Sequence, residues 1–190
     1  MSGDFYKEWR AKAEIDYFPN LVTLWLSTNS WYRSHYSEIE GRRDRSFLNA
    51  LRADHSSRNK MFSRFKRILQ SDGTKENGEL INNMEGLFFS LNRAELHWEE
   101  SDSRVINFEY CLLAPHPKEY GSLMVNMQSS GIRLNEHNKM TGDYSLLFNG
   151  LLEIVYQVRC QLIHGQLEPN KENHEVVKQV YFLLYAFMNF

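Results

Sequence analysis

The residues best suited to chemistry lie near the C-terminal end, in the stretch VYQVRCQLIHGQL at 155–167. Arg159 interrupts an otherwise apolar run, and His164 follows five residues later, directly before Gly165. An imidazole titrates near neutral pH and serves as an acid or a base, and a guanidinium matches the oxygens of a phosphate or carboxylate. These two side chains are the first candidates for a functional site.

Each of the two residues also has a structural interpretation. An unpaired buried charge is costly, so Arg159 requires a partner. That partner is either an acidic residue elsewhere in the chain, or a phosphate or another subunit. A histidine in the last turn of a helix interacts with the negative end of the helix dipole, so His164 also fits a simple capping role.

Helix geometry separates Arg159 from His164. Five residues correspond to about 140° of rotation and about 7.5 Å of rise, so the side chains diverge within one molecule. Two copies meeting across a two-fold axis would bring them together, which predicts a homodimer through residues 150–165.

Arg159 also lies about 160° from the centre of a polar strip on the same helix. This strip consists of Asn149, Glu153, Gln157 and Gln161.

The elements that must position these residues are mainly helical. Apolar spacing and cap residues predict helices at 4–17, 19–37, 44–69 (one long or two shorter), 143–164 and 173–189. Pro19 suits the first turn of the second helix and Gly165 ends the fourth. Residues 80–141 are expected to be irregular with short helices. The fold class is therefore all-α, in one domain over 1–190, and the short link between the last two helices makes them antiparallel neighbours.

Composition narrows the function classes. The chain has 190 residues, 42% of them hydrophobic, and a net charge of −2, which excludes a wholly basic nucleic-acid binder. Cys111 and Cys160 match no disulfide or zinc spacing, and no nucleotide loop or metalloprotease motif occurs. No signal peptide or membrane-spanning run is recognisable. We expect a cytoplasmic protein without cofactor, metal or membrane contact.

Charge is distributed unevenly along the chain. Residues 42–67 hold nine Lys or Arg and only two Asp. This segment could follow an RNA backbone, with Arg58, Arg64 and Arg67 as the binding residues. The alternative is a solvated basic helix face, neutralised by carboxylates for which the candidates are Glu95, Glu99 and Glu100.

A further candidate is Asn29, which precedes the aromatic residues of Asn29-Ser30-Trp31-Tyr32. Its amide could donate a hydrogen bond into a site. A satisfied amide in the core is the more common situation for such a residue.

Taken together, these residues resemble those of HEPN domains. VYQVRCQLIHG is similar to the HEPN signature, an Arg followed by four to six residues and then His at the end of a long helix. Arg159 and His164 are the only pair in the chain with this spacing. LLEIVYQV, Gly165 and the earlier segment LWLSTNSWYRSHYSEI are also similar to the family. The resemblance covers about 20–69 and 143–190. It implies a HEPN-like antiparallel helical bundle, with 72–141 as an irregular insertion.

The resemblance implies a helical bundle that dimerises through the motif helices. Active HEPN proteins are metal-independent endoribonucleases, often toxins or antiviral effectors. His164 would take the proton from a ribose 2′-hydroxyl, and Arg159 would stabilise the phosphorane. The products would be a 2′,3′-cyclic phosphate and a 5′-hydroxyl. Many catalytic members have a polar residue after the Arg, where this chain has Cys160; Gln161 is a possible substitute.

Three functions therefore compete. The first is a dimeric HEPN ribonuclease in toxin–antitoxin or antiphage defence, with RNA as substrate and a minimal nucleotidyltransferase as a possible antitoxin. The second is a non-catalytic HEPN module that binds a nucleotidyltransferase or a nucleotide. The third is a structural helical protein without a ligand, which gives Arg159 no role. Cys160 favours the second, whereas Arg159 and His164 favour the first.

Overall fold

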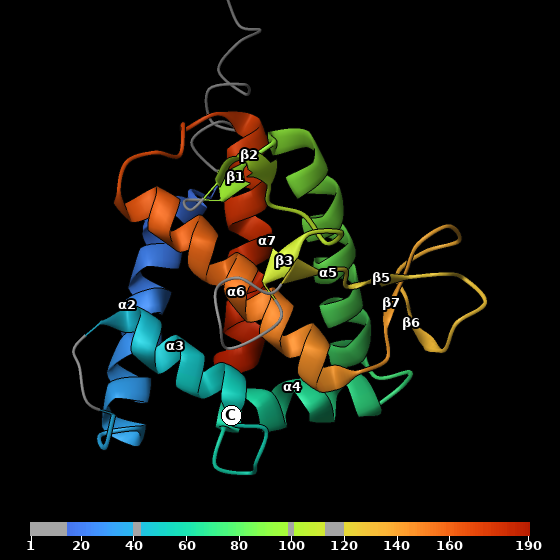
Figure 1. The fold of residues 1–190 in the computed structure, drawn as a ribbon, viewed down its shortest axis with the longest axis horizontal. Helices are drawn as coiled ribbons and strands as arrows, with labels where there is room; N and C mark the ends of the chain where they lie inside the picture. The colour runs from blue at the N-terminus through green and yellow to red at the C-terminus, as the bar shows by residue number, and fades with distance from the viewer. Residues whose placement is uncertain (1–14, 40–42, 99–100, 113–119) are drawn as a thin grey trace, which may run out of the picture.

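The computed structural model describes residues 15–39, 43–98, 101–112 and 120–190, and most of this part is helical (Figure 1). Its helices are α2 (Tyr17–His35), α3 (Asp44–Ala53), α4 (Lys60–Gln70), α5 (Lys75–Ala94), α6 (Tyr144–Ile163) and α7 (Lys171–Met188). The predicted helices at 19–37, 143–164 and 173–189 are confirmed, and 44–69 forms two helices. The helix predicted over 4–17 falls almost entirely outside the described residues.

Helix α7 lies at the centre, between α2 and α5, and α6 crosses in front of it (Figure 1). Helices α2 and α7 run in the same direction. The rings of Tyr17 and His174, near the two starts, are 5.7 Å apart, and those of Trp31 and Phe190, near the two ends, are 5.2 Å apart. The predicted antiparallel arrangement is wrong for this pair.

The other two neighbours of α7 are antiparallel to it. Phe148, near the start of α6, packs on Phe187, near the end of α7, with 5.5 Å between the rings. The start of α5 shares a hollow with the end of α7, and the end of α5 shares one with the start of α7. The bundle therefore mixes parallel and antiparallel contacts around a central helix.

The irregular structure expected from residue 80 onward is wrong for 80–94, because α5 is one continuous helix. Thr74 caps it, its hydroxyl oxygen accepting from the Asn77 N–H at 3.2 Å. Gly86 lies within this helix, where a Cβ would meet the flexible end of the Gln179 side chain of α7 at 2.7 Å.

Short antiparallel strands follow α5, but the described part of the chain is mostly helical, which is consistent with the predicted all-α class. β1 (His97–Trp98) pairs with β2 (Ser101–Val105), and β3 (Cys111–Leu112) with β4 (Tyr120–Gly121). A third sheet has the order β5 (Met124–Val125), β7 (Lys139–Thr141), β6 (Gly131–Arg133). Phe108 and Leu123 from this region are fully buried against the helices.

No described helix is long and apolar enough to cross a membrane.

Candidate functional site

Local sequence defines the ends of α6 and so the positions of its two candidate residues. Asp143 caps the start, where its carboxylate accepts from the N–H groups of Ser145 and Leu146. At the other end, Gly165 has a φ of 68°, a conformation that favours glycine. Arg159 therefore lies in the last two turns, and His164 is the C-cap.

Arg159 finds its partner within the chain. Its Nη2 donates to Asp44 Oδ2 at 2.9 Å, and its guanidinium lies 5.0 Å from the centre of the Trp25 ring. Its Nη1 donates to Cys160 Sγ at 3.7 Å, and its Nε is buried without a hydrogen-bond partner among the described residues. The side chain is 15% exposed. The partner is thus an acidic residue, as the structural interpretation required.

Asp44 holds more than one cation. Its Oδ1 accepts from Arg33 Nη2 at 2.7 Å and from Asn29 Nδ2 at 3.1 Å, and Arg33 Nε in turn donates to Asn29 Oδ1. The predicted candidate Asn29 is therefore a satisfied amide, yet it shares a carboxylate with Arg159. We call Asn29, Arg33, Asp44 and Arg159 the Asp44 cluster.

The charges of this cluster support ionisation of its carboxylate. Burial alone would raise the pKa of Asp44, but the hydrogen bond from Arg33 and the charge of Arg159 outweigh it, and the pKa is lowered. The cluster thus carries one negative and two positive charges. Arg33 is 36% exposed and Asp44 only 16%, so the cluster opens to solvent mainly on the Arg33 side.

A second cluster lies deeper between α3 and α6. Glu153 is fully buried and accepts from Arg45 at 2.7 Å, from Arg52 at 2.9 Å and from Gln157 at 3.0 Å. Arg52 is also fully buried, whereas Arg45 is 25% exposed. We call Arg45, Arg52, Glu153 and Gln157 the Glu153 centre.

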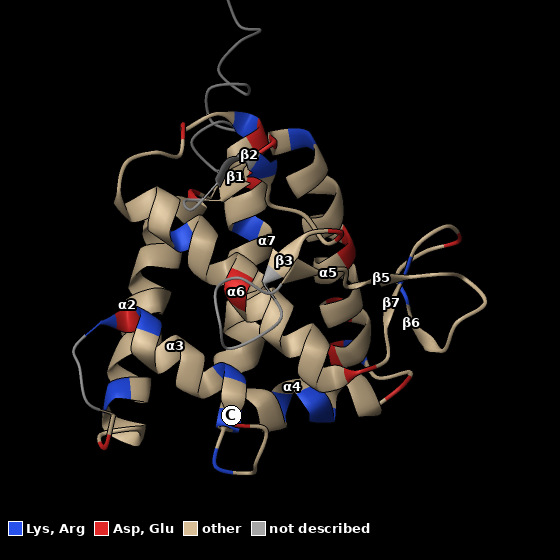
Figure 2. Ribbon diagram, viewed as in Figure 1, with Lys and Arg blue, Asp and Glu red and all other residues tan. Residues whose placement is uncertain are grey.

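Aromatic rings connect the two clusters. The Arg45 guanidinium lies 4.2 Å from the centre of the Tyr156 ring, which packs 5.9 Å from Trp25, the ring beneath Arg159. Figure 2 shows an acidic position in the middle of α6 and opposite charges where α3 begins beside α2.

The polar strip of α6 faces inward. Glu153 and Gln157 belong to the Glu153 centre, and Asn149 Oδ1 is 3.3 Å from His55 Nε2. Gln161, considered as a support for Arg159, donates instead to the backbone oxygen of His97 in β1. The strip therefore attaches α6 to α3 and to β1.

His164 is exposed, and its side chain makes no hydrogen bond or ion pair with the described residues, Arg159 included. Arg159 and His164 therefore have no described contact with each other within one chain. The predicted dimer helix is largely occupied by the chain's own core. Within 150–165, only the last three residues are exposed, Ile163 among them at 44%.

The three arginines predicted to bind RNA have different surroundings. Arg58 pairs with Glu38 and lies 4.6 Å from the centre of the Tyr36 ring. Arg64 is buried and pairs with Glu76 at 2.8 Å. Only Arg67, in the last turn of α4, is exposed and without a described ion pair.

Of the three carboxylates expected to neutralise the basic face, only Glu95 lies in the described part of the chain. The described ion pairs of this segment use Glu38, Glu76 and Glu153. Glu95 is exposed and takes no part in them, and Glu99 and Glu100 lie outside the described residues.

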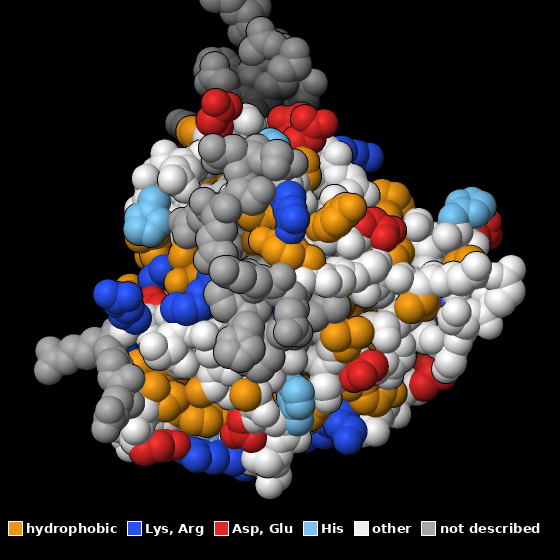
Figure 3. Space-filling view, viewed as in Figure 1, with side chains coloured by type: hydrophobic (Ala, Val, Ile, Leu, Met, Phe, Trp, Pro, Cys, Tyr) orange, Lys and Arg blue, Asp and Glu red, His pale blue; other side chains and the backbone are white. Residues whose placement is uncertain are grey.

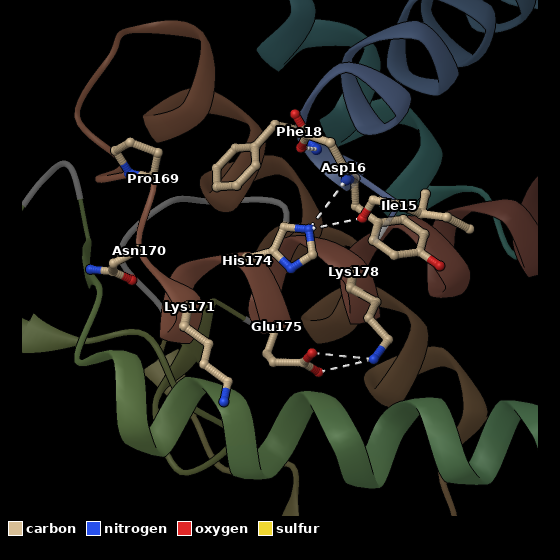
Figure 4. A pocket seen from close by; sticks show the side chains of 10 residues that line it. Ile15, Asp16, Phe18, Pro169, Asn170, Lys171, His174, Glu175 and Lys178 are labelled. Carbon is tan, nitrogen blue, oxygen red and sulfur yellow. Dashed lines mark hydrogen bonds and ion pairs between the residues drawn. The ribbon is translucent and has the colours of Figure 1, made fainter. Parts of the chain in front are cut away.

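A cavity of about 880 Å³ lies elsewhere, between the starts of α2 and α7 (Figure 4). His174 Nε2 lies 3.1 Å from the Ile15 oxygen, and Glu175 pairs with Lys178 at 3.2 Å. None of the predicted site residues lines it. Among the described residues, no group of three His, Cys, Asp or Glu is placed to hold a metal ion.

Sequence reasoning missed Arg33, Asp44, Arg45 and Arg52. Asp44 had one signal, because it is one of only two acidic residues in the basic segment 42–67. Comparison with protein-family models, curated proteins and solved structures finds no match to this chain. The candidate site therefore stands on its own geometry.

Proposed function

We propose that this chain is a metal-independent endoribonuclease of the HEPN type, active as a homodimer. The observation that carries the proposal is the end of α6, where an exposed histidine without a described partner follows an arginine held near the surface by a shared carboxylate. Asp44 pairs with both Arg159 and Arg33, so two guanidinium groups lie beside this end of α6, where they can attract a phosphate.

Each residue then has a chemical role. His164 of one protomer removes the proton from a ribose 2′-hydroxyl, and the histidine of the second protomer protonates the leaving oxygen. Arg159 stabilises the negative charge that develops on the phosphorane. Asp44 and Trp25 orient the guanidinium, and Arg33 adds positive charge beside it. Such an enzyme would serve as a toxin or antiphage effector.

The test is RNA cleavage in excess EDTA. His164→Ala should lower the rate by about a hundredfold or more, the usual contribution of a general acid or base. Arg159→Ala should lower it by about as much. His137→Ala, which removes another exposed histidine, is the matched control and should cleave normally. Cleavage of a substrate lacking the scissile 2′-hydroxyl, or a requirement for magnesium, would refute the mechanism.

The assembly has its own test. Light scattering at tens of micromolar protein should give the mass of a dimer, because one protomer presents its arginine and histidine on diverging faces. A cleaving monomer would refute the shared site.

A second function is favoured by one specific observation. Arg159 is already paired with Asp44, and Cys160 follows it where catalytic HEPN members often have a polar residue. In this alternative the chain is a non-catalytic HEPN module that binds a nucleotidyltransferase or a nucleotide. RNA that remains intact with wild-type protein under all conditions, together with tight nucleotide binding, would favour this module.

A further inference from the structure

A small polar hollow lies where the chain passes from α3 to α4. It has a volume of about 270 Å³, roughly that of nine water molecules at ~30 Å³ each. One wall is the loop after α3, with His55 and Ser57, and the other is the outer face of α4. Ser63, Lys66 and Arg67 lie on that face at helical spacing, so their side chains point to the same side.

The loop wall is held in place from inside. Asn59 is fully buried, and its Nδ2 donates to the backbone oxygens of Leu51 and Asp54, both at 2.8 Å. Its Oδ1 accepts from the Phe62 N–H at 3.0 Å and so caps α4. The His55 ring packs 4.9 Å from Phe62 at the base of the hollow. The hollow is therefore preorganised rather than an open loop.

The electrostatics of the hollow suit an anion. None of the described residues that line it is acidic, and Lys66 and Arg67 are exposed and have no described ion pair. The neighbouring arginines differ, because Arg58 and Arg64 are paired with carboxylates. With His55 Nε2 turned to Asn149, Nδ1 remains available to a ligand. Hydroxyls, an ammonium and a guanidinium together form a phosphate-binding set.

The hollow and the Asp44 cluster lie at opposite ends of the same helix pair. Asp44, at the start of α3, contacts Arg159, and His55, just after the end of α3, contacts Asn149. These two contacts are about ten residues apart along α3 and also along α6, which corresponds to roughly 15 Å. Figure 3 shows the face on which α3 and α6 lie, with basic and histidine side chains along its lower part, where Figure 1 draws α4 and the α3–α4 loop.

We propose that this hollow binds a backbone phosphate of the RNA substrate, a few nucleotides from the scissile phosphate at Arg159 and His164. The inference rests on the proposed ribonuclease function and adds a second anchoring point to it. Arg67 and Lys66 make the phosphate contacts, with Ser63 and Ser57 as hydroxyl donors. Of the three arginines predicted from sequence, only Arg67 then touches RNA.

Binding is measured first, by fluorescence anisotropy of a labelled single-stranded RNA with the His164→Ala protein. Lys66→Gln with Arg67→Gln should weaken binding by tenfold or more at low salt. The slope of log affinity against log salt should fall by about 1.4, since each phosphate contact to a single strand contributes about 0.7. Arg93→Gln with Lys171→Gln, two exposed cations on α5 and α7, is the control of equal charge. An equal loss of RNA affinity in both double variants would contradict phosphate binding in this hollow.

Cleavage then locates the phosphate along the strand. Neutral methylphosphonate linkages, placed one at a time, should raise the KM of wild-type enzyme at one position away from the cut. In the Lys66→Gln, Arg67→Gln enzyme the same linkage should have no further effect. An equal rise in KM for the methylphosphonate at every position would overturn the proposal. If no RNA is cleaved, the ribonuclease function fails, but the binding experiment still decides whether the hollow takes a phosphate.

Discussion

The two carboxylates at the α3–α6 contact have the same partners by type but different surroundings. Asp44 and Glu153 each hold two arginines and one side-chain amide. Glu153 and Arg52 are fully buried, whereas Asp44 and Arg159 retain about a sixth of their side-chain exposure. Burial, rather than composition, therefore separates a structural ion pair from a candidate binding site.

The physical reason is the cost of exchanging partners. Removing one member of a fully buried pair leaves a charge without water, which is strongly unfavourable. At the Asp44 cluster water or a phosphate can replace the carboxylate, because Arg33 already faces solvent. An arginine that must bind and release substrate is therefore better placed at a partly exposed site such as the Asp44 cluster.

The largest effect is expected from Glu153→Gln. Arg52 would lose the carboxylate of Glu153 while its side chain remains fully buried. The free energy of unfolding should therefore fall by about 3–5 kcal/mol. Urea denaturation followed by circular dichroism measures the change. Glu175→Gln, which removes an exposed partner of Lys178, is the control and should change stability by about 0.5 kcal/mol or less. A similar loss in both variants would contradict the comparison.

A smaller effect on stability, with a gain in binding, is expected from Asp44→Asn. The loss should be about 1–3 kcal/mol, because charge-assisted hydrogen bonds from two arginines disappear but both remain near water. RNA affinity of the His164→Ala protein should rise several-fold, since Arg33 and Arg159 are released to bind phosphate. Anisotropy measures this gain. A variant that binds RNA more weakly would show that Asp44 is purely structural.

The sequence predicted the helices whose signals are local. Asp143 and Gly165 mark the ends of α6, and apolar spacing marks α2 and α7. Helix α5 was missed because Gly86 and a polar composition suggest breaks, whereas the chain forms one continuous helix from the Thr74 cap to Ala94. The parallel direction of α2 and α7 depends on tertiary contacts that no local pattern encodes.

The site was predictable only in part, for the same reason. Spacing singled out Arg159 and His164, and the requirement for a partner was deduced from apolar neighbours. The partner itself, Asp44, is 115 residues away in the chain. Arg64 looked like a surface cation in a basic segment, but the chain reversal before α5 brings Glu76 to it.

Acid should remove part of the contribution of Asp44. Its pKa is lowered in the folded protein, so its stabilisation is present above the unfolded value of 3.8 and is lost as pH falls through the folded pKa. The stability difference between wild type and Asp44→Asn should therefore shrink as pH falls from 5 to 3. Urea midpoints across this range provide the measurement. A difference that stays constant would place the effect of Asp44→Asn in packing rather than charge.

The smallest effect is expected from Arg33→Gln. Arg33 is the most exposed arginine of the two clusters, at 36%, and Asp44 keeps Arg159 and Asn29 when it is removed. Stability should fall by about 1 kcal/mol or less, within the range of partly exposed ion pairs. RNA binding should weaken modestly, both because a cation is lost and because Asp44 then binds Arg159 without competition. Urea denaturation and anisotropy measure the two changes. A loss as large as that of Glu153→Gln would mean that exposure does not distinguish the clusters, and the comparison would have to rest on another property.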